Sequence, residues 1–419
     1  MGLTAKKIVL VTSGQPSLNP RLVKEADALV EAGYEVTVIY QYWNEWGTDL
    51  DKVLLPQKKW KTIRVGGDPI KEKTAYWWSR VKLKIGQKLV QLLGFNYGLA
   101  ELTIGRCTFQ LLHEARHNRA ALYIAHNLAA LPAAVSAAQK FKAKCGFDAE
   151  DLHRYEMSDS DLNVDVRLKK YIEDKYFPST NYLTTSSPEI AKRYEALYPV
   201  LKFTTLLNVF PKVTLTPTNT TRSSVPLKLF WFSQNVGLSR GLQDVIAALK
   251  ILEQEVIEFH ILGFLSPNVN NELEQFIAAL HFVKPPQLIF HPPIVATELA
   301  QFASQYDIGL ATEPGFSINN DIALSNKIFT YAQAGLAIVA SDTTAQKSFM
   351  TMYPNMGMVY EKKNPSNLAT IIKTYIEDQT LLNQHQVKAA NYAEEILNWE
   401  TEKEKFLMII NHLLANPNN

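Results

Sequence analysis

Two runs of alternating strand and helix patterns constrain the fold of this chain more than any other feature. In the first run, the apolar segment 6–12 predicts a buried strand, 20–32 places apolar residues at helical spacing, and 35–40 predicts a second strand. A strand, a helix and a strand within about 40 residues form a βαβ unit, which needs a parallel sheet with helices on its faces. Further strand patterns in this run cover 121–125, 144–147, 182–185 and 203–207.

A polar tract at 214–226 interrupts the alternation. It is rich in threonine, serine and proline and cannot bury a core, so we predict an interdomain linker. Beyond it, strand patterns return at 227–233, 258–262, 287–291, 307–311 and 337–340. At 419 residues the chain is long enough for two domains. We therefore predict two consecutive α/β domains, over 1–213 and 227–397, followed by an amphipathic helix in 398–419.

The composition excludes several classes of protein. A formal net charge of +2 gives no general reason to expect a nucleic-acid partner. Cys107 and Cys145 are too few for a disulfide framework or a metal cluster, which favours a reducing, cytoplasmic location. The apolar run 8–12 is shorter than the core of a signal peptide, and no stretch approaches the ~20 apolar residues of a spanning helix. We expect a soluble or surface-associated protein.

Polar residues follow the predicted strands of the first domain, where open α/β sheets bind their ligands. The loop 13–17 contains Gly14 and precedes a helix, whose N-terminus attracts anions. Because the loop lacks the GxGxxG pattern, it argues against a dinucleotide-dependent dehydrogenase, and a plain strand–helix turn is the alternative. His126 and Asn127 lie at the end of another predicted strand, where the alternative is a histidine that only satisfies local hydrogen bonds.

An acidic segment follows the predicted strand 144–147. Its carboxylates are Asp148, Glu150, Asp151 and Glu156. Carboxylates at a binding cleft can accept hydrogen bonds from sugar hydroxyls or a proton from an attacking hydroxyl. A solvated acidic loop is the alternative, but the apolar flanks of the segment favour a functional role.

The second domain shows one pattern twice, a cation close to the start of a helix. The loop after its first strand runs from Gln234 to Arg240, and Lys327 starts a later helix beside Ser325 and Asn326, the candidate caps. A cation is unfavourable at a helix N-terminus unless an anion binds between them, and the guanidinium fork matches phosphate oxygens. The pattern therefore indicates a diphosphate site.

The chain that carries these motifs resembles glycosyltransferase family 4 over nearly its whole length. The similarity rests on Asn19-Pro20-Arg21, Ala125-His126-Asn127, Leu207-Asn208-Val209-Phe210-Pro211 and, most specifically, Ser325-Asn326-Lys327-Ile328-Phe329 with the strand after it. It implies the α/β fold called GT-B, in which two Rossmann-like domains face each other across a cleft, the first on the acceptor side and the second on the donor side. The helix in 398–419 would cross back to the first domain.

The resemblance also implies an activity and roles for single residues. A sugar would pass from a nucleotide diphosphate-sugar of the UDP or GDP type to a glycan or lipid-linked acceptor, with retained anomeric configuration and without metal or cofactor. Arg240 and Lys327 would neutralise the diphosphate, Glu313 would hold donor-sugar hydroxyls, and His126 would lie near the transferred sugar. The predicted donor-binding residues are Gly14, Gln234, Arg240, Gly263, Glu313, Gly315, Phe316, Asn326, Lys327 and Thr330, and the predicted acceptor-side residues are Asn127, Asp148, Glu150 and Asp151.

Two positions depart from the pattern of this family. Gln234 stands where the family has an arginine, and Thr330 stands where it has a glutamate that contacts the ribose, for which Asp321 is a substitute. These departures support an alternative function, a catalytically impaired GT-B scaffold that binds sugar or nucleotide without transfer. A third class, an epimerase or hydrolase with the same donor site, would turn over the donor without an acceptor.

The segment 58–93 is a candidate membrane contact. It is strongly basic, and its helical part carries Trp77 and Trp78. Cations together with interfacial aromatic residues suit an anionic bilayer surface, and a contact of this kind would serve a lipid-linked acceptor. The alternative is a helix that packs on the domain with its lysines solvated. No motif that reads nucleic acid accompanies the segment.

Overall fold

The computed structural model describes residues 6–215 and 225–415, which divide into two compact units. The first unit comprises the described residues up to Leu207 together with those from Lys403 onward, and the second unit is Asn208–Glu402. Most of the expected linker 214–226 lies outside the described residues. The change of unit at Leu207 comes before the expected domain end at residue 213.

The first unit is built on a seven-stranded parallel sheet in the order β3-β2-β1-β4-β5-β6-β7. Its strands are β1 (Lys7–Thr12), β2 (Glu35–Gln41), β3 (Lys61–Val65), β4 (Leu122–His126), β5 (Lys144–Ala149), β6 (Tyr182–Thr185) and β7 (Phe203–Thr205). Strands β1 and β4 are almost continuously apolar because both faces of a parallel sheet are covered. The order of the first five strands is that of Rossmann-like sheets, as predicted.

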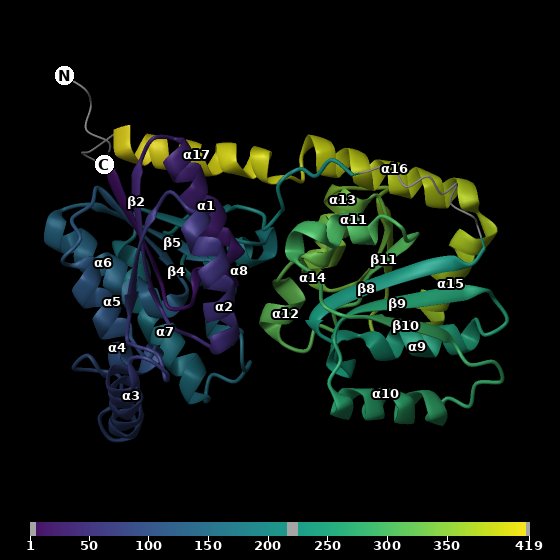
Figure 1. Cartoon of the computed structure of the whole chain (residues 1–419), viewed down its shortest axis with the longest axis horizontal. Coiled ribbons are helices and arrows are strands. Elements are labelled where there is room, and N and C mark those ends of the chain that lie inside the picture. The colour runs from purple at the N-terminus through teal and green to yellow at the C-terminus, as the bar shows by residue number, and fades with distance from the viewer. Residues whose placement is uncertain (1–5, 216–224, 416–419) are drawn as a thin grey trace. The chain divides into compact units, whose positions relative to one another are not determined.

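Helices cover both faces of this sheet. They are α1 (Pro20–Glu31), α2 (Glu45–Leu54), α3 (Lys73–Leu93), α4 (Leu99–Ile104), α5 (Thr108–Ala115), α6 (Leu131–Phe141), α7 (Val164–Tyr176) and α8 (Pro188–Leu197). Figure 1 shows α1 on one side of the sheet and α5 and α6 on the other. Helix α1 begins where the sequence predicts, because the Asn19 side chain accepts a hydrogen bond from the Leu22 N–H and Pro20 occupies the first turn.

The last helix, α17 (Trp399–Ala415), contributes its residues from Lys403 onward to the first unit. Lys6 Nζ donates a hydrogen bond to the Leu414 carbonyl at 2.8 Å, and the Tyr34 hydroxyl donates to Asn411 Oδ1 at 2.8 Å. The end of the chain therefore packs beside the strands with which it begins.

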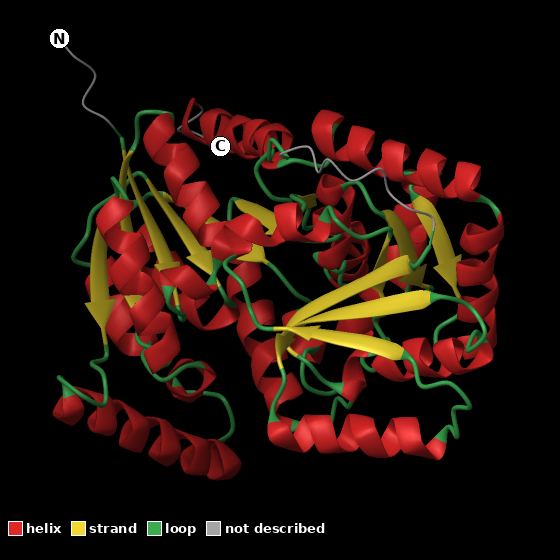
Figure 2. Ribbon diagram, turned by 45° about the vertical axis from the view of Figure 1, so that its right-hand side comes forward, coloured by secondary structure: helices red, strands yellow, loops and turns green. Residues whose placement is uncertain are grey.

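The second unit contains a six-stranded parallel sheet in the order β10-β9-β8-β11-β12-β13. Its strands are β8 (Leu227–Asn235), β9 (Ile257–Phe264), β10 (Gln287–His291), β11 (Ile308–Ala311), β12 (Ala337–Ser341) and β13 (Gly357–Tyr360). Its helices are α9 (Leu242–Ile251), α10 (Pro267–Ala279), α11 (Leu299–Ala303), α12 (Ile318–Ile322), α13 (Lys327–Ala334), α14 (Thr344–Met352), α15 (Pro365–Glu377) and α16 (Gln379–Glu395). Figure 2 shows the strands of each unit as a layer flanked by helices. The predicted architecture, two parallel α/β sheets, is confirmed.

Two helices of the second unit differ from expectation. The helix expected at 272–280 begins at Pro267, because Ser266 caps it by accepting a hydrogen bond from the Val269 N–H. The helix expected at 297–304 is split into a 3-10 turn, Ala296–Glu298, and the short α11. Neither change moves the strand ends at which a site is expected.

Gly309 of β11 offers a test of packing in the second unit. A Cβ at this position would lie 2.2 Å from Cγ of the Tyr331 ring, which is fully buried and held by a 3.0 Å hydrogen bond to the Leu310 carbonyl. We expect Gly309→Ala to lower the free energy of unfolding by about 1–3 kcal/mol, the usual cost of overpacking. Thermal unfolding would measure this. Gly237→Ala is the control, because the nearest atom to its Cβ would be 3.9 Å away, and equal losses in both variants would contradict the prediction.

Candidate functional site

The core of the candidate site is an ion pair at the carboxyl ends of the strands in the second unit. Lys327 Nζ, at the start of α13, donates to Glu313 Oε1 at 2.5 Å, and the Ser325 hydroxyl donates to the same oxygen at 2.9 Å. Both charged side chains are almost fully buried. Burial alone would raise the pKa of Glu313, but Lys327, Ser325 and Arg240 together lower it below its usual value. Glu313 is therefore a carboxylate with one oxygen already engaged.

The backbone behind Glu313 is held rigidly. The Ser341 hydroxyl, at the end of β12, donates to the Glu313 carbonyl at 2.6 Å. Gln346 Nε2 donates to the Ala311 carbonyl at 3.0 Å and to Ser341 Oγ at 2.8 Å. Lys327 Nζ also lies 5.5 Å from the centre of the buried Trp231 ring, a cation–π distance. This support fixes the side chain of Glu313 before any ligand binds.

Arg240 is brought beside this pair by a close contact between two loops. Gly241, at φ 81°, has its Cα so near the Thr312 carbonyl that an added Cβ would lie 1.9 Å from that oxygen. The Thr312 hydroxyl also donates to the Arg240 carbonyl at 3.1 Å. Among the described residues, the exposed guanidinium of Arg240 has no ion pair. One paired and one unpaired cation therefore lie near a single carboxylate.

The N-terminus of helix α13 is capped by no side chain of the described residues. The structure corrects our assignment of the caps, because Asn326 makes no side-chain cap hydrogen bond and Ser325 donates to Glu313 instead. The Ile328 N–H donates to the Ser325 carbonyl at 3.2 Å, and the helix dipole attracts an anion at this end. Asn326 therefore contributes backbone, not a capping amide, to the expected diphosphate site.

A loop after β11 carries two further residues of the predicted donor set. Gly315, at φ 64°, donates its N–H to Asn320 Oδ1 at 2.8 Å, and Phe316 beside it is 70% exposed. Asp321 is occupied, since its carboxylate accepts hydrogen bonds from Lys362 and from Thr344. An exposed ring on a fixed loop is suited to contact a ligand, whereas the engaged Asp321 is poorly suited to replace a ribose-binding glutamate.

The remaining predicted donor residues divide into exposed and buried ones. Gln234 is exposed at the end of β8, whereas Thr330 is 2% exposed within α13. Gly263, at φ 151°, has a structural reason to be glycine, because an added Cβ would lie 2.2 Å from the Ser233 carbonyl. Gly14 lies in the first unit, where its N–H donates to Thr12 Oγ1 at 3.2 Å. Their contact with a donor stays a prediction.

In the first unit, His126 lies at the centre of a buried charge cluster. Its Nε2 is 3.1 Å from Glu25 Oε2, and its Nδ1 is 3.4 Å from Glu150 and 3.5 Å from Asp148. Burial alone would lower the pKa of His126, but Glu25, Glu150 and Asp148 raise it to about 10. His126 is therefore an imidazolium with no exposed surface, and its predicted contact with a sugar stays a prediction.

Asp148 has a structural role in this cluster. Arg21 Nε and Nη2, from α1, donate to its two oxygens at 2.7 Å each, and the Thr184 hydroxyl donates at 2.8 Å. The ligand atoms of Glu25, His126 and Asp148 lie within 4.8 Å of one another, a spacing that suits a metal ion, but Arg21 already takes both Asp148 oxygens. Asp148 is 1% exposed, so of the acidic residues predicted on the acceptor side the partly exposed Glu150 and Asp151 are the better placed.

Asn127, directly after His126, has an unusual backbone. Its φ of 68° and ψ of 143° lie in a region that residues other than glycine rarely adopt. Its Oδ1 accepts a 2.8 Å hydrogen bond from the Thr12 hydroxyl, at the end of β1. Backbone strain of this kind clusters at functional sites, so the geometry supports the prediction that the end of β4 has a functional role.

The charge cluster predicts a pH dependence of stability. Because the pKa of His126 in the folded state, about 10, exceeds its ordinary value of 6.5, its stabilising contribution is fully present below about pH 6.5 and is lost as pH rises through about 10. Lys24, whose pKa burial and Arg21 lower to about 7, acts in the opposite sense over the same range. The useful comparison is therefore between the wild type and His126→Gln. We expect the wild type to melt at a higher temperature than His126→Gln at low pH, and this difference to shrink as pH rises from about 6.5 to about 10. A difference that stays constant over this range would contradict the prediction.

The comparisons with known proteins place this geometry on a known fold. No protein-family model matches the chain, and no curated protein sequence matches it. Solved structures do match. A glycosyltransferase from Rickettsia africae has a TM-score of 0.67 at 14% identity, covering 99% of this chain and 100% of that one. HepE from Anabaena, in complex with UDP and glucose, has a TM-score of 0.67 at 14% identity, covering 97% and 100%. The chain has the GT-B fold. A TarM mutant from S. aureus, in complex with fondaparinux, alpha-GlcNAc-glycerol and UDP, has a TM-score of 0.68 at 12% identity, covering 97% and 100%.

Several residues that support the candidate residues of each unit were not predicted from the sequence. Arg21 entered only as part of a family motif and no role was predicted for Glu25, although two charges four residues apart among the apolar positions of α1 signal a buried polar contact. Ser341 and Gln346 support Glu313 from the segment after β12. Nothing in their local pattern indicates this contact, because it joins loops that only the fold brings together.

Proposed function

We propose that this protein is a glycosyltransferase that takes a sugar from a nucleotide diphosphate-sugar, with UDP as the nucleotide. The observation that supports it best is the buried Glu313–Lys327 pair beside Arg240 and the uncapped N-terminus of α13, on a GT-B fold. Binding of a diphosphate needs positive charge and backbone N–H donors, and binding of the sugar ring needs a fixed group that accepts hydrogen bonds from its hydroxyls. Both are present at the carboxyl ends of the strands in the second unit. UDP occurs in the structures of HepE and of the TarM mutant, which supports this choice of nucleotide.

The chain's own residues suffice for a mechanism without metal. As the bond between the sugar and the diphosphate breaks, negative charge grows on the phosphate, and Arg240, Lys327 and the α13 N-terminus stabilise it. The second oxygen of Glu313, which accepts no hydrogen bond from the described residues, is available for a sugar hydroxyl. The acceptor hydroxyl attacks the face from which the diphosphate leaves and gives its proton to the departing phosphate oxygen, so the new glycosidic bond forms as the old bond breaks and the configuration is retained, as the resemblance to glycosyltransferase family 4 implies. Excess chelator should leave the rate unchanged, and NMR of the product should show the donor's anomeric configuration.

Arg240 is the residue whose removal tests this proposal without disturbing the fold. It is exposed and has no ion pair among the described residues, so Arg240→Ala should leave the melting temperature unchanged. We expect it to weaken UDP binding by at least about tenfold, the worth of one charge-assisted hydrogen bond. Calorimetric titration would measure this. Lys347→Ala, which removes another exposed cation from the same unit, is the control. Equal affinity in Arg240→Ala and wild type would contradict the assignment.

A catalytically impaired scaffold is the second candidate function. Gln234, which is exposed at the end of β8 where the resembled family has an arginine, favours it. The two proposals differ in a single assay, release of UDP from UDP-glucose with and without acceptor glycans or lipids. A transferase releases UDP only with an acceptor, a hydrolase releases it without one, and a scaffold releases none while still binding UDP.

The first unit supplies the acceptor side in this proposal, and α3 is its membrane contact. None of the described helices is both long and apolar enough to cross a bilayer. Helix α3, in contrast, leaves Trp77 57% exposed and Trp78 56% exposed beside several lysines. Such a surface binds anionic lipid headgroups. We therefore place the protein at the cytoplasmic face of a membrane. Co-sedimentation with anionic but not zwitterionic vesicles would support this placement.

A further inference from the structure

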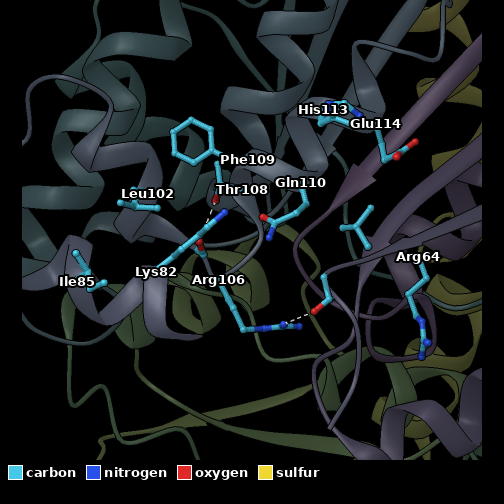
Figure 3. A pocket seen from close by; sticks show the side chains of 13 residues that line it. Arg64, Lys82, Ile85, Leu102, Arg106, Thr108, Phe109, Gln110, His113 and Glu114 are labelled. Carbon is cyan, nitrogen blue, oxygen red and sulfur yellow. Dashed lines mark hydrogen bonds between the residues drawn. The ribbon is translucent and has the colours of Figure 1, made fainter. Parts of the chain in front are cut away.

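A cavity of about 630 Å³ opens in the first unit beside β3, the edge strand of the sheet. Its walls come from the end of β3, from α3, from α4 and the turn that follows it, and above all from α5. Figure 3 shows Lys82 reaching from α3 toward Phe109 and Thr108 across this space. None of the residues assigned above to the donor or acceptor lines it.

Residues that line the cavity are hydrogen-bonded to the carboxyl end of the sheet, the end at which open α/β sheets bind their ligands. Arg106 donates hydrogen bonds to the carbonyls of Gly66 and Tyr42, which follow β3 and β2, at 2.8 Å each. The Thr108 hydroxyl donates to the Ala129 carbonyl at 3.2 Å, two residues after Asn127. One lining residue of the cavity is therefore hydrogen-bonded to the segment that carries His126 and Asn127.

Two cations in the lining are not neutralised by a carboxylate of the described chain. The guanidinium of Arg106 is held by carbonyls and by the Ser79 hydroxyl, none of which carries a charge. Lys82 makes only a cation–π contact, 5.4 Å from the Trp78 ring. Arg64 is paired with Asp68 and Glu72, and Glu114 is the one carboxylate in the lining. The cavity therefore favours a ligand with negative charge.

The other part of the lining is apolar and continues beyond the cavity. Leu102 and the 44% exposed Phe109 face Ile85, which is 49% exposed on α3. Val81, 42% exposed, lies four residues before Ile85, and the 81% exposed Leu92 lies two turns beyond it. Residues at this spacing share a helix face. An aliphatic chain that leaves the cavity would find apolar surface along α3.

We propose that this cavity binds the phosphate and the first part of the aliphatic chain of a lipid phosphate. The inference rests on the proposed function, because such a lipid would be the carrier of the acceptor. The phosphate contacts Lys82 and the outer edge of Arg106, and the chain lies against Ile85, Leu102 and Phe109. Helix α3 thus forms one wall of the lipid-phosphate site in addition to contacting the membrane.

Calorimetric titration of the full chain with decyl phosphate, below its micelle concentration, tests the proposal. We expect saturable binding at one site. Lys82→Glu should weaken it at least about tenfold, because an attractive cation beside the phosphate is replaced by a repulsive carboxylate. Lys84→Glu is the matched control: it makes the same charge change on the same helix outside the cavity, and it should change the affinity less than twofold. Equal weakening by both variants would show non-specific attraction to a basic helix and would overturn the site.

A second pair of variants tests the apolar wall. Phe109→Ser should weaken decyl phosphate binding, whereas Tyr97→Ser, at a position 92% exposed and outside the cavity, should not. Inorganic phosphate and decyl maltoside should each bind at least about tenfold more weakly than decyl phosphate, because each lacks one half of the ligand. Equal affinity for inorganic phosphate would overturn the role of the chain.

The protein could meet such a lipid as a dispersed molecule or within a bilayer. Binding of the variants to anionic vesicles, compared with their binding to dispersed decyl phosphate, distinguishes the two. If Lys82→Glu loses decyl phosphate binding but keeps its binding to anionic vesicles, the cavity and the membrane face are distinct, as proposed. A second outcome would overturn the proposal. In it, Lys82→Glu and Lys84→Glu lose vesicle binding equally, and both variants still bind decyl phosphate as tightly as the wild type. The cavity would then not bind the lipid phosphate. UDP titration of each variant keeps the donor proposal separate, because Lys82 lies in the first unit and Lys327 in the second.

Discussion

Replacing Lys327 with alanine is expected to weaken UDP binding at least about tenfold and to lower kcat/KM for UDP-glucose at least about a hundredfold. The larger effect on the rate follows because negative charge on the leaving diphosphate is greatest in the transition state, where Lys327 acts at the N-terminus of α13. Glu313 would also lose the cation that lies 2.5 Å from its Oε1. Calorimetry and a UDP-release assay measure the two quantities.

A structural role for Lys327 has to be separated from its role at the donor. Removing one partner of a buried ion pair destabilises a protein by about 3–5 kcal/mol, so Lys327→Ala alone should also melt at a lower temperature. The double variant Lys327→Ala, Glu313→Gln leaves no unpaired charge and should recover most of that stability. We expect its UDP affinity and activity to stay low. Recovery of UDP affinity together with stability would show that Lys327 only holds the fold.

Replacing Asp148 with asparagine is expected to destabilise the first unit by about 3–5 kcal/mol, because Arg21 would be left buried beside a neutral amide. The carboxylate, whose pKa Arg21 and His126 hold down at about 2 in spite of burial, accepts two hydrogen bonds from Arg21 and one from Thr184. An amide nitrogen cannot accept any of them. Hydrogen–deuterium exchange would show the loss of protection in peptides of the first unit and none in the second.

The control for this variant is an exposed ion pair in the same unit. Asp49 and Lys52 are paired at 2.7 Å with more than half of each side chain exposed. Asp49→Asn should leave the exchange of the first unit unchanged, because solvent screens such pairs. If Asp148→Asn is as stable as Asp49→Asn, the buried cluster does not hold β5 to α1.

The strands that the sequence predicted include all those in the interior of the two sheets. Strands β1 and β4 appear as apolar runs with turns at either end. The two strands that were missed, β3 and β13, consist mostly of exposed or half-buried residues and lie at sheet edges, although the edge strands β7 and β10 were predicted. Helix α1, which has a cap and a proline at its start, was predicted to within a residue, whereas α10, which begins with the same two signals, was expected five residues too late.

The site was predictable where one local pattern carried its chemistry. Lys327, a cation at a helix start, indicated an anion, and the structure places its ammonium on Glu313, 14 positions earlier. Arg21 and Asp148 lie 127 positions apart, and no local pattern pairs them. Asp148 was predicted to face the acceptor because a carboxylate after a strand reads the same whether it is buried or exposed. Burial depends on the neighbouring α1, which the sequence pattern around Asp148 does not reveal.

The most direct test of the proposed function is a calorimetric titration of the wild-type chain with UDP, GDP, ADP, dTDP and CMP in the presence of a chelator. We expect one diphosphate, UDP, to bind at a single site and to raise the melting temperature, because a ligand that binds only the folded state stabilises it. Binding should be lost in Lys327→Ala and kept in Lys347→Ala. If none of the five nucleotides binds a well-folded sample, the second unit has no functional donor site and the proposed transferase activity is contradicted.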